Sequence, residues 1–176
     1  MNTFGTPTFG GNNTGTTSVT IPKPTDLIVG RILVVALRSQ DGSSANVWTA
    51  PEGFVLRSSP FPTMPQSGTR VGAIFMKVIT EADLNSSVTG YTFTGPSGRN
   101  IGVAIRWDPD LVGDLVSFGY SPYGGTGATN GVVTIAARTA TGVGITFVLI
   151  GSELTAGIAK APSSIPSGFT EIANSQ

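Results

Sequence analysis

The sequence predicts an all-β protein: an antiparallel β-sandwich, jelly-roll-like, with about nine to eleven short strands. It contains 24 Gly and 12 Pro among 176 residues, which provides many turns between short elements. Thr, Val and Ile account for 52 further residues, and their branched side chains fit a pleated sheet better than a helix. No stretch shows ten or more residues of clean helical periodicity, so helices are not expected to carry the fold.

The first strands have the clearest patterns. Residues 17–21 alternate polar and apolar side chains, which is the two-residue period of a half-buried strand. Residues 32–39 begin with six consecutive apolar residues, which favours a central strand. A Pro-Glu-Gly turn at 51–53 then leads into a short strand at 54–56.

The next segments continue the same architecture. Residues 70–79 alternate well and predict a strand, and residues 81–84 predict a single helical turn. Residues 91–94 predict a short strand that ends at the following Gly-Pro pair, and residues 101–107 predict another. Weaker patterns complete the expected strands, at 115–118, 132–135, 145–150 and 169–172.

Three short motifs of the first half recur in the second half with similar spacing. The segments 19–21, 32–37 and 51–54 are echoed, in order, by 133–135, 145–150 and 166–169. The distances between successive segments agree to within two residues. We therefore expect equivalent strands to occupy matching places in the two halves, in a domain that either closes at Gln176 or belongs to a longer chain.

The domain organisation follows from composition. Residues 1–16 are mostly Gly, Thr and Asn and predict an extended N-terminal arm, whereas residues 17–176 predict one β-sandwich domain. The arm carries two large apolar side chains, Phe4 and Phe9. Either they fold back onto their own sandwich, or the arm docks on a neighbouring subunit and adds a strand to its sheet.

The charge content excludes several classes of protein. Ten Lys and Arg balance ten Asp and Glu, and charged residues make up 11% of the chain, against about 25% in an average domain. This balance argues against nucleic-acid binding through a basic surface. The sparse charge instead suggests a surface that meets other proteins. No segment resembles a signal peptide or is apolar for long enough to insert into a membrane.

No catalytic, cofactor-binding or metal-binding constellation is present, and we expect a protein that is not an enzyme. The chain lacks Cys and His, which excludes disulfides, thiol catalysis and His-based triads. Asp108, Asp110 and Asp114 could offer oxygen ligands to calcium, but the first two flank a Pro and are typical of a turn that ends a strand. No Ser-x-x-Lys motif occurs, and nothing pairs two carboxylates.

Aromatic residues in or beside the predicted loops could bind a glycan, because a ring face stacks on the apolar face of a sugar. They are Trp48, Phe61, Tyr120 and Tyr123. The competing interpretation is that each ring packs its own loop onto the core or lies at a subunit contact.

Several motifs in order resemble a known group of virus proteins. They are a Val-Thr-Ile-Pro strand at 19–22, APEGF at 50–54, VGAIFMKVIT at 71–80, EAD at 81–83, YTFTGPSG at 91–98 and IGVAIRW at 101–107. This order resembles the β-sandwich domain of bacteriophage minor tail and other virion proteins, often of phages that infect actinobacteria. The resemblance covers residues 17–176.

The resemblance implies a non-enzymatic virion structural protein, with a minor tail or tail-tip component preferred over a head protein. Its expected partners are other virion proteins and copies of itself. Two alternatives remain open: a carbohydrate-binding module for adsorption to host surface glycans, and a head decoration protein. The resemblance implies no catalytic residue and no cofactor.

Overall fold

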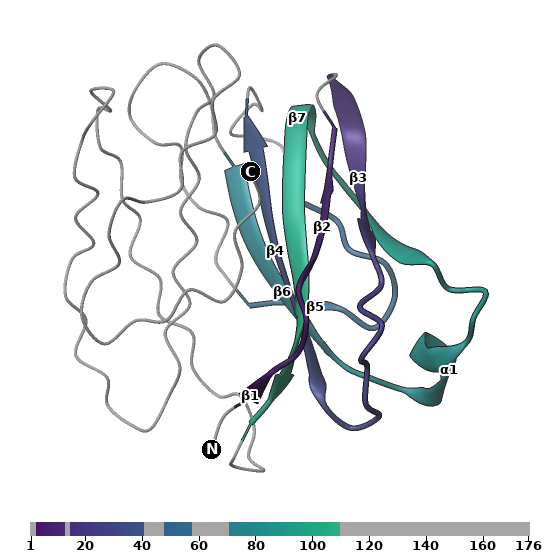
Figure 1. Cartoon of the computed structure of the whole chain (residues 1–176). Helices are drawn as coiled ribbons and strands as arrows, with labels where there is room; N and C mark the ends of the chain where they lie inside the picture. The colour runs from purple at the N-terminus through teal and green to yellow at the C-terminus, as the bar shows by residue number, and fades with distance from the viewer. Residues whose placement is uncertain (1–2, 13–14, 41–47, 58–70, 110–176) are drawn as a thin grey trace, which may run out of the picture.

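The computed structural model of the chain describes residues 3–12, 15–40, 48–57 and 71–109 (Figure 1). These ranges form strands and one short helix, and every pair of neighbouring strands is antiparallel. The elements are β1 (Thr3–Phe4), β2 (Thr8–Gly11), β3 (Thr16–Pro22), β4 (Ile32–Gln40), β5 (Val55–Leu56), β6 (Val71–Val78), α1 (Glu81–Leu84) and β7 (Gly90–Asp108). The prediction of an all-β, antiparallel fold is confirmed, while the sandwich of nine to eleven strands and its jelly-roll connectivity stay predictions.

The strand β4 lies in the middle of the larger sheet, as its apolar run predicts. It pairs along its length with β6 on one side and with the second half of β7 on the other. The sheet order is β1-β7-β4-β6-β5, and β2 also pairs with β7. Strand β6 forms within the predicted range 70–79, and α1 forms at the predicted helical turn.

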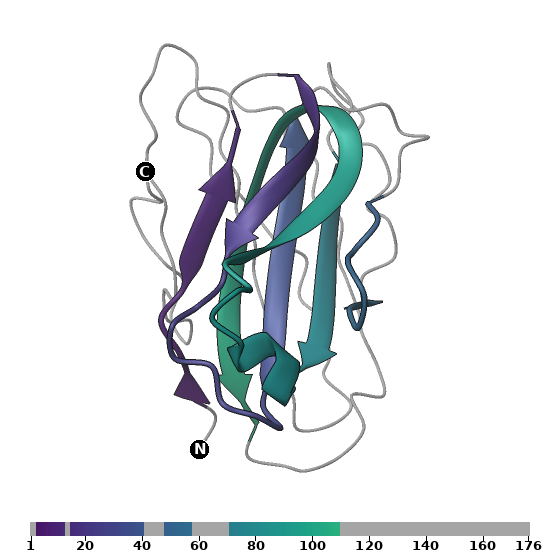
Figure 2. The same ribbon diagram turned by 90° about the vertical axis from the view of Figure 1, so that its right-hand side faces the viewer.

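The strand β7 is longer than the sequence pattern predicts. Instead of two strands separated at Gly95-Pro96, one strand runs through 19 residues. Its first half pairs with β3, and its second half pairs with β4, β2 and β1. Figure 2 shows the strand arching over between the two pairings. The register of β3 against β7 shifts between Thr16 and Ser18, which pair with Gly98 and Thr94. Pro96 lies at this irregularity, where the strand does not need a backbone N–H to donate to its neighbour.

The side chain of Asn100 holds this arch. Its Nδ2 donates to the carbonyl oxygens of Thr16, at 2.8 Å, and Pro96, at 3.1 Å. Its backbone N–H donates to Oδ1 of Asn12 at 3.2 Å, and the N–H of Asn12 donates back to the carbonyl of Asn100 at 2.9 Å. Side-chain amides therefore replace ladder hydrogen bonds where the backbone bends.

One core lies between the β3–β7 ribbon and the larger sheet, which pack face to face (Figures 1 and 2). The two layers bury apolar side chains against each other, among them Val19, Ile21 and Phe93 from the ribbon and Leu33, Val35, Leu37 and Phe75 from the sheet. The rings of Phe75 and Phe93 lie 5.4 Å apart, and that of Phe54 meets Phe93 edge to face at 5.2 Å. These aromatic contacts connect the two layers across the core.

The N-terminal segment lies along the molecule's own sheet. β1 and β2 pair with the second half of β7, with Phe4 opposite Trp107 and Phe9 opposite Val103. Of the two alternatives for this segment, the described residues adopt the one in which it folds back onto its own chain. The pairing is possible because β7 offers an otherwise unpaired edge there.

The helix α1 has four residues, and no helix within the described ranges is long and apolar enough to cross a membrane.

Candidate functional site

Trp48, one of the predicted glycan-binding residues, is buried. The indole is 5% exposed and belongs to the core between the two layers. Its neighbour Thr49 forms an isolated bridge with Thr94 of β7, which fixes this segment against the ribbon. The expectation that Trp48 offers its ring to a sugar is therefore wrong for this structure, because the ring packs on Gly95 instead. The other three residues, Phe61, Tyr120 and Tyr123, lie outside the described residues.

The two aromatic residues of the N-terminal segment differ in exposure. Phe4 is half-buried and packs against a cluster that includes Trp107. Phe9 is 38% exposed on β2. Phe9 is thus the one of the two whose ring remains partly available to another molecule.

The predicted alternative of a calcium site receives no support at Asp108. Its carboxylate accepts a hydrogen bond from Nε of Arg106 at 3.0 Å and one from Oγ1 of Thr3 at 3.1 Å. Asp110 and Asp114 lie outside the described residues. In the part of the chain that is described, no group of three or more acidic side chains could hold a metal ion.

A buried polar cluster that the sequence analysis did not single out lies at one end of the core. Its centre is Asp83 in α1, which is 4% exposed. The Oδ2 atom accepts from the backbone N–H and from Oγ1 of Thr80, each at 2.9 Å. The Oδ1 atom accepts from Nζ of Lys77 at 2.7 Å and from the hydroxyl of Tyr91 at 3.1 Å. Each oxygen of this carboxylate therefore has two donors.

This geometry shifts the pKa values of Asp83 and Tyr91. Burial alone would raise the pKa of Asp83, but the hydrogen bonds from Lys77 and Thr80 and the charge of Lys77 outweigh it and lower the pKa. Burial also raises the pKa of Tyr91, and the negative charge and hydrogen-bonding carboxylate of Asp83 raise it further. At neutral pH the cluster therefore contains an ionised Asp83 and a neutral Tyr91.

Two lysines fix α1 to the rest of the molecule. The ammonium of Lys77 lies over two rings, 5.2 Å from the centroid of Phe54 and 5.6 Å from that of Tyr91. The ammonium of Lys23 donates to the carbonyl oxygens of Asp83, at 3.1 Å, and Asn85, at 2.8 Å. These two carbonyls lie at the C-terminal end of the helix, where no intrahelical donor is left for them. The cluster joins β6, α1, β7 and the loop after β3.

A sequence signal for part of this cluster exists. Thr80 and Asp83 have the spacing of a capping box, in which a hydroxyl residue is followed three positions later by an acid. The partners Lys77 and Tyr91 could not be assigned in the same way, because strand-to-helix contacts of this kind depend on how the elements pack.

A second ionic cluster joins β7 to the loop that precedes β4. Arg106 lies 3.3 Å from the carboxylate of Asp26 and donates to its carbonyl oxygen as well as to Asp108. The same Asp26 carboxylate accepts the backbone N–H of Thr6 at 2.8 Å. Most charged side chains of the described ranges have polar partners within the molecule; among them are Lys23, Asp26, Arg31, Lys77, Asp83, Arg106 and Asp108.

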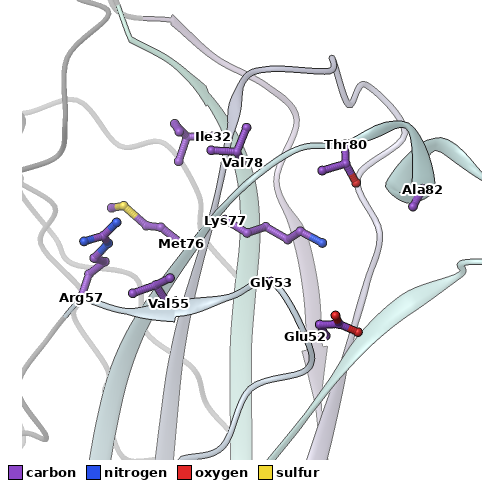
Figure 3. Close-up of a pocket in the computed structure, with 10 residues that line it drawn as sticks. All are labelled: Ile32, Glu52, Gly53, Val55, Arg57, Met76, Lys77, Val78, Thr80 and Ala82. Atoms are coloured by element: carbon purple, nitrogen blue, oxygen red, sulfur yellow. The ribbon is translucent and has the colours of Figure 1, made fainter.

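A hollow of about 660 Å³ lies beside the first cluster, between β5, β6 and the start of α1 (Figure 3). Its lining mixes apolar side chains from β4, β5 and β6 with polar ones: Ile32, Glu52, Gly53, Val55, Arg57, Met76, Lys77, Val78, Thr80 and Ala82. Lys77 is already bound to Asp83, and no nucleophile paired with a base is found among these lining residues.

No known protein family, curated protein or solved structure matches the chain.

Proposed function

We propose that the chain is a non-enzymatic structural component of a bacteriophage particle, placed in the tail or at the tail tip, where it docks on neighbouring subunits. The order of sequence motifs supports the virion class. The observation that carries the docking role is an exposed apolar edge beside the hollow, in a part of the chain where most of the described charged side chains have partners within the molecule.

The exposed apolar edge is formed by β5 and the end of β6. Val55 is 50% exposed and Val78 is 56% exposed, and Leu56 is exposed as well. β5 has only two residues and is the last strand of the sheet path. Apolar side chains at a sheet edge are characteristic of surfaces that meet another protein.

The low charge of the chain favours such association. Burying an ion requires removing its hydration shell, whereas an apolar edge gains free energy when it leaves water. The internal ion pairs of Asp83 and Arg106 add rigidity at the two ends of β7 without placing unpaired charge on this edge. We infer that the domain is a rigid structural unit of a larger assembly, and that its partners are other virion proteins or copies of itself.

The carbohydrate-binding alternative is not favoured by any described residue. Trp48 is buried, and it was the only one of the four predicted aromatics that lies within the described ranges. A head decoration protein would share the same docking chemistry, so the experiment must also distinguish the tail from the head.

The direct test is to locate the protein on particles of the virus that encodes it. Antibodies raised against the purified chain are applied to particles with gold detection, and the same antibodies pre-absorbed with the purified chain are the control. Label at the tail or its tip is the expected result. Label on the head would replace the tail assignment by a decoration role, and particles without label would overturn the virion proposal.

A further inference from the structure

The outer side of β5 presents backbone groups to which another strand can be added. The backbone N–H of Arg57 donates to the carbonyl of Ile74 at 2.8 Å, and Val55 pairs with Met76. Because hydrogen-bonded positions alternate along an antiparallel pair, the N–H and C=O of Leu56 point away from β6. Among the described strands, none pairs with β5 on that side. An added antiparallel strand would exchange both hydrogen bonds of Leu56 with a single residue of its own.

A cationic side chain lies beside this edge without a polar partner among the described residues. Arg57 and Val55 are two positions apart in extended chain, so both side chains lie on the same face of the sheet as that of Met76. Figure 3 shows the guanidinium of Arg57 beside the side chain of Met76, with Lys77 directed away from both. The Nε atom of Arg57 has no hydrogen-bond partner, and no ion pair between described residues includes this side chain.

The neighbouring acids do not supply the missing partner. Asp83 is bound to Lys77 at 2.7 Å, and Glu52, which also lines the hollow, is directed away from Arg57 in Figure 3. A strand that covered the edge would take the guanidinium of Arg57 out of water, and an unpaired buried charge is strongly unfavourable. A strand that binds here must therefore bring an acceptor opposite Arg57.

We propose that the exposed apolar edge binds an extended acidic segment of a neighbouring subunit, which adds to β5 as an antiparallel strand. A carboxylate matches Arg57 because it accepts two parallel hydrogen bonds from the planar guanidinium. The position opposite Val55 lies next to Ile32 and Val78 as well, so it takes an aliphatic side chain. Read along the partner, the segment is an acid, then any residue, then an aliphatic residue. This inference rests on the proposed docking role and specifies the chemistry of the partner.

A protective role for Arg57 is the alternative that the test must separate. Charged side chains on a short edge strand can prevent unwanted pairing with other chains. In that case Arg57 would weaken the addition of every strand, whatever its sequence. If Arg57 instead selects an acidic strand, its replacement weakens the binding of acidic segments alone.

Peptide titration of the purified full chain tests the proposal. The probe is Thr-Thr-Glu-Thr-Val-Thr-Thr with blocked ends, and the comparison peptides carry Gln or Lys in place of Glu. The amide resonance of Leu56 in isotope-labelled protein reports binding, since NMR detects the weak affinity expected of a two-residue strand. We expect this resonance to shift, and the Glu peptide to bind at least about fivefold more tightly than the Lys peptide. Methylation of the backbone nitrogen of the central Thr should abolish binding, because that residue then cannot donate to the carbonyl of Leu56.

Charge reversal identifies the residue responsible for the preference. Arg57→Glu should invert it, so that the Lys peptide binds more tightly than the Glu peptide. Arg99→Glu makes the same change at an exposed position of β7 outside the hollow, and this control should keep the parental order. The peptide Thr-Thr-Val-Thr-Glu-Thr-Thr has the same composition as the probe and should bind more weakly, because its acid would lie opposite Val55.

Three results would overturn the proposal. They are the absence of a shift at Leu56 with any peptide, equal affinity for the Glu and Lys peptides, and tighter binding of all peptides by Arg57→Ala. The last result would show that the arginine protects the edge. Because the titration uses the purified chain alone, its failure together with antibody label on the tail would exclude the acidic strand and keep the virion role. Peptide binding together with particles that carry no label would do the reverse.

Discussion

Gly95 lies directly against the indole ring of Trp48. A Cβ atom at position 95 would be 2.6 Å from both Cδ2 and Cζ3 of the ring, closer than atoms of this kind approach. The absence of a side chain on β7 at this point is therefore what allows the indole to enter the core.

Gly95→Ala should destabilise the protein, because the new methyl group displaces Trp48. Overpacking of this kind costs about 1–3 kcal/mol. Urea unfolding followed by Trp fluorescence measures the loss. Gly15→Ala is the matched control, since the nearest atom to its Cβ would be 4.0 Å away, and we expect little change there. Equal stability of the two variants would show that the ring moves without cost.

Lys77→Met should destabilise strongly, since it leaves Asp83 ionised and buried without its cation. Removing one partner of a buried pair costs about 3–5 kcal/mol. The Lys77→Met/Asp83→Leu double variant should recover part of the loss, because no unpaired charge remains. Glu81→Gln, in the same helical turn but exposed, is the control and should unfold like the parent. A Lys77→Met variant as stable as the control would contradict the cluster's role.

Acid should weaken the fold through Asp83. The pKa of this carboxyl is lowered in the folded state, so its stabilising contribution is present above the usual value of 3.8 and is lost as pH falls below it. Thermal unfolding at a series of pH values between roughly 6 and 2 measures this loss. Asp83→Asn should be less stable at neutral pH and show a shallower acid slope. Parallel curves for the two proteins would rule out this assignment.

Alkali should weaken the fold through Tyr91. Its pKa is raised in the folded state, so the neutral phenol stabilises the fold below the usual value of 10.0, and the contribution is lost as pH rises above it. Tyr91→Phe removes the ionisable group and should flatten this alkaline loss. Absorbance of phenolate during alkaline titration checks the sign, since Tyr91 should ionise only when the protein unfolds.

Replacing Val55 by Asp should impair assembly without unfolding the domain, because the side chain is half exposed and its charge would resist burial at a subunit contact. We expect reduced incorporation into particles in a complementation assay. Thr89→Asp, which adds the same charge at an exposed position near the end of the ribbon, is the control. Normal incorporation of both variants would exclude the edge as the docking surface.

Sequence patterns were sufficient to predict those elements in which the buried side chains follow the local periodicity of the chain. The apolar run of β4, the alternation of β6 and the single turn of α1 are all visible within ten residues, and the structure places each where it was expected. The capping-box spacing of Thr80 and Asp83 is also visible in the sequence. The role of Asp83 at the centre of a buried cluster becomes clear only from its partners Lys77 and Tyr91.

Sequence alone therefore determined the all-β class and the main strands, because alternation and β-branched content depend on neighbours along the chain. Only the tertiary structure decided that β7 continues through Gly95-Pro96, that Trp48 is buried and that Lys77 and Tyr91 share the carboxylate of Asp83. Each of these depends on which surfaces lie opposite one another once the layers pack. A glycine, a proline or a loop aromatic has no preference of its own that predicts such a neighbour.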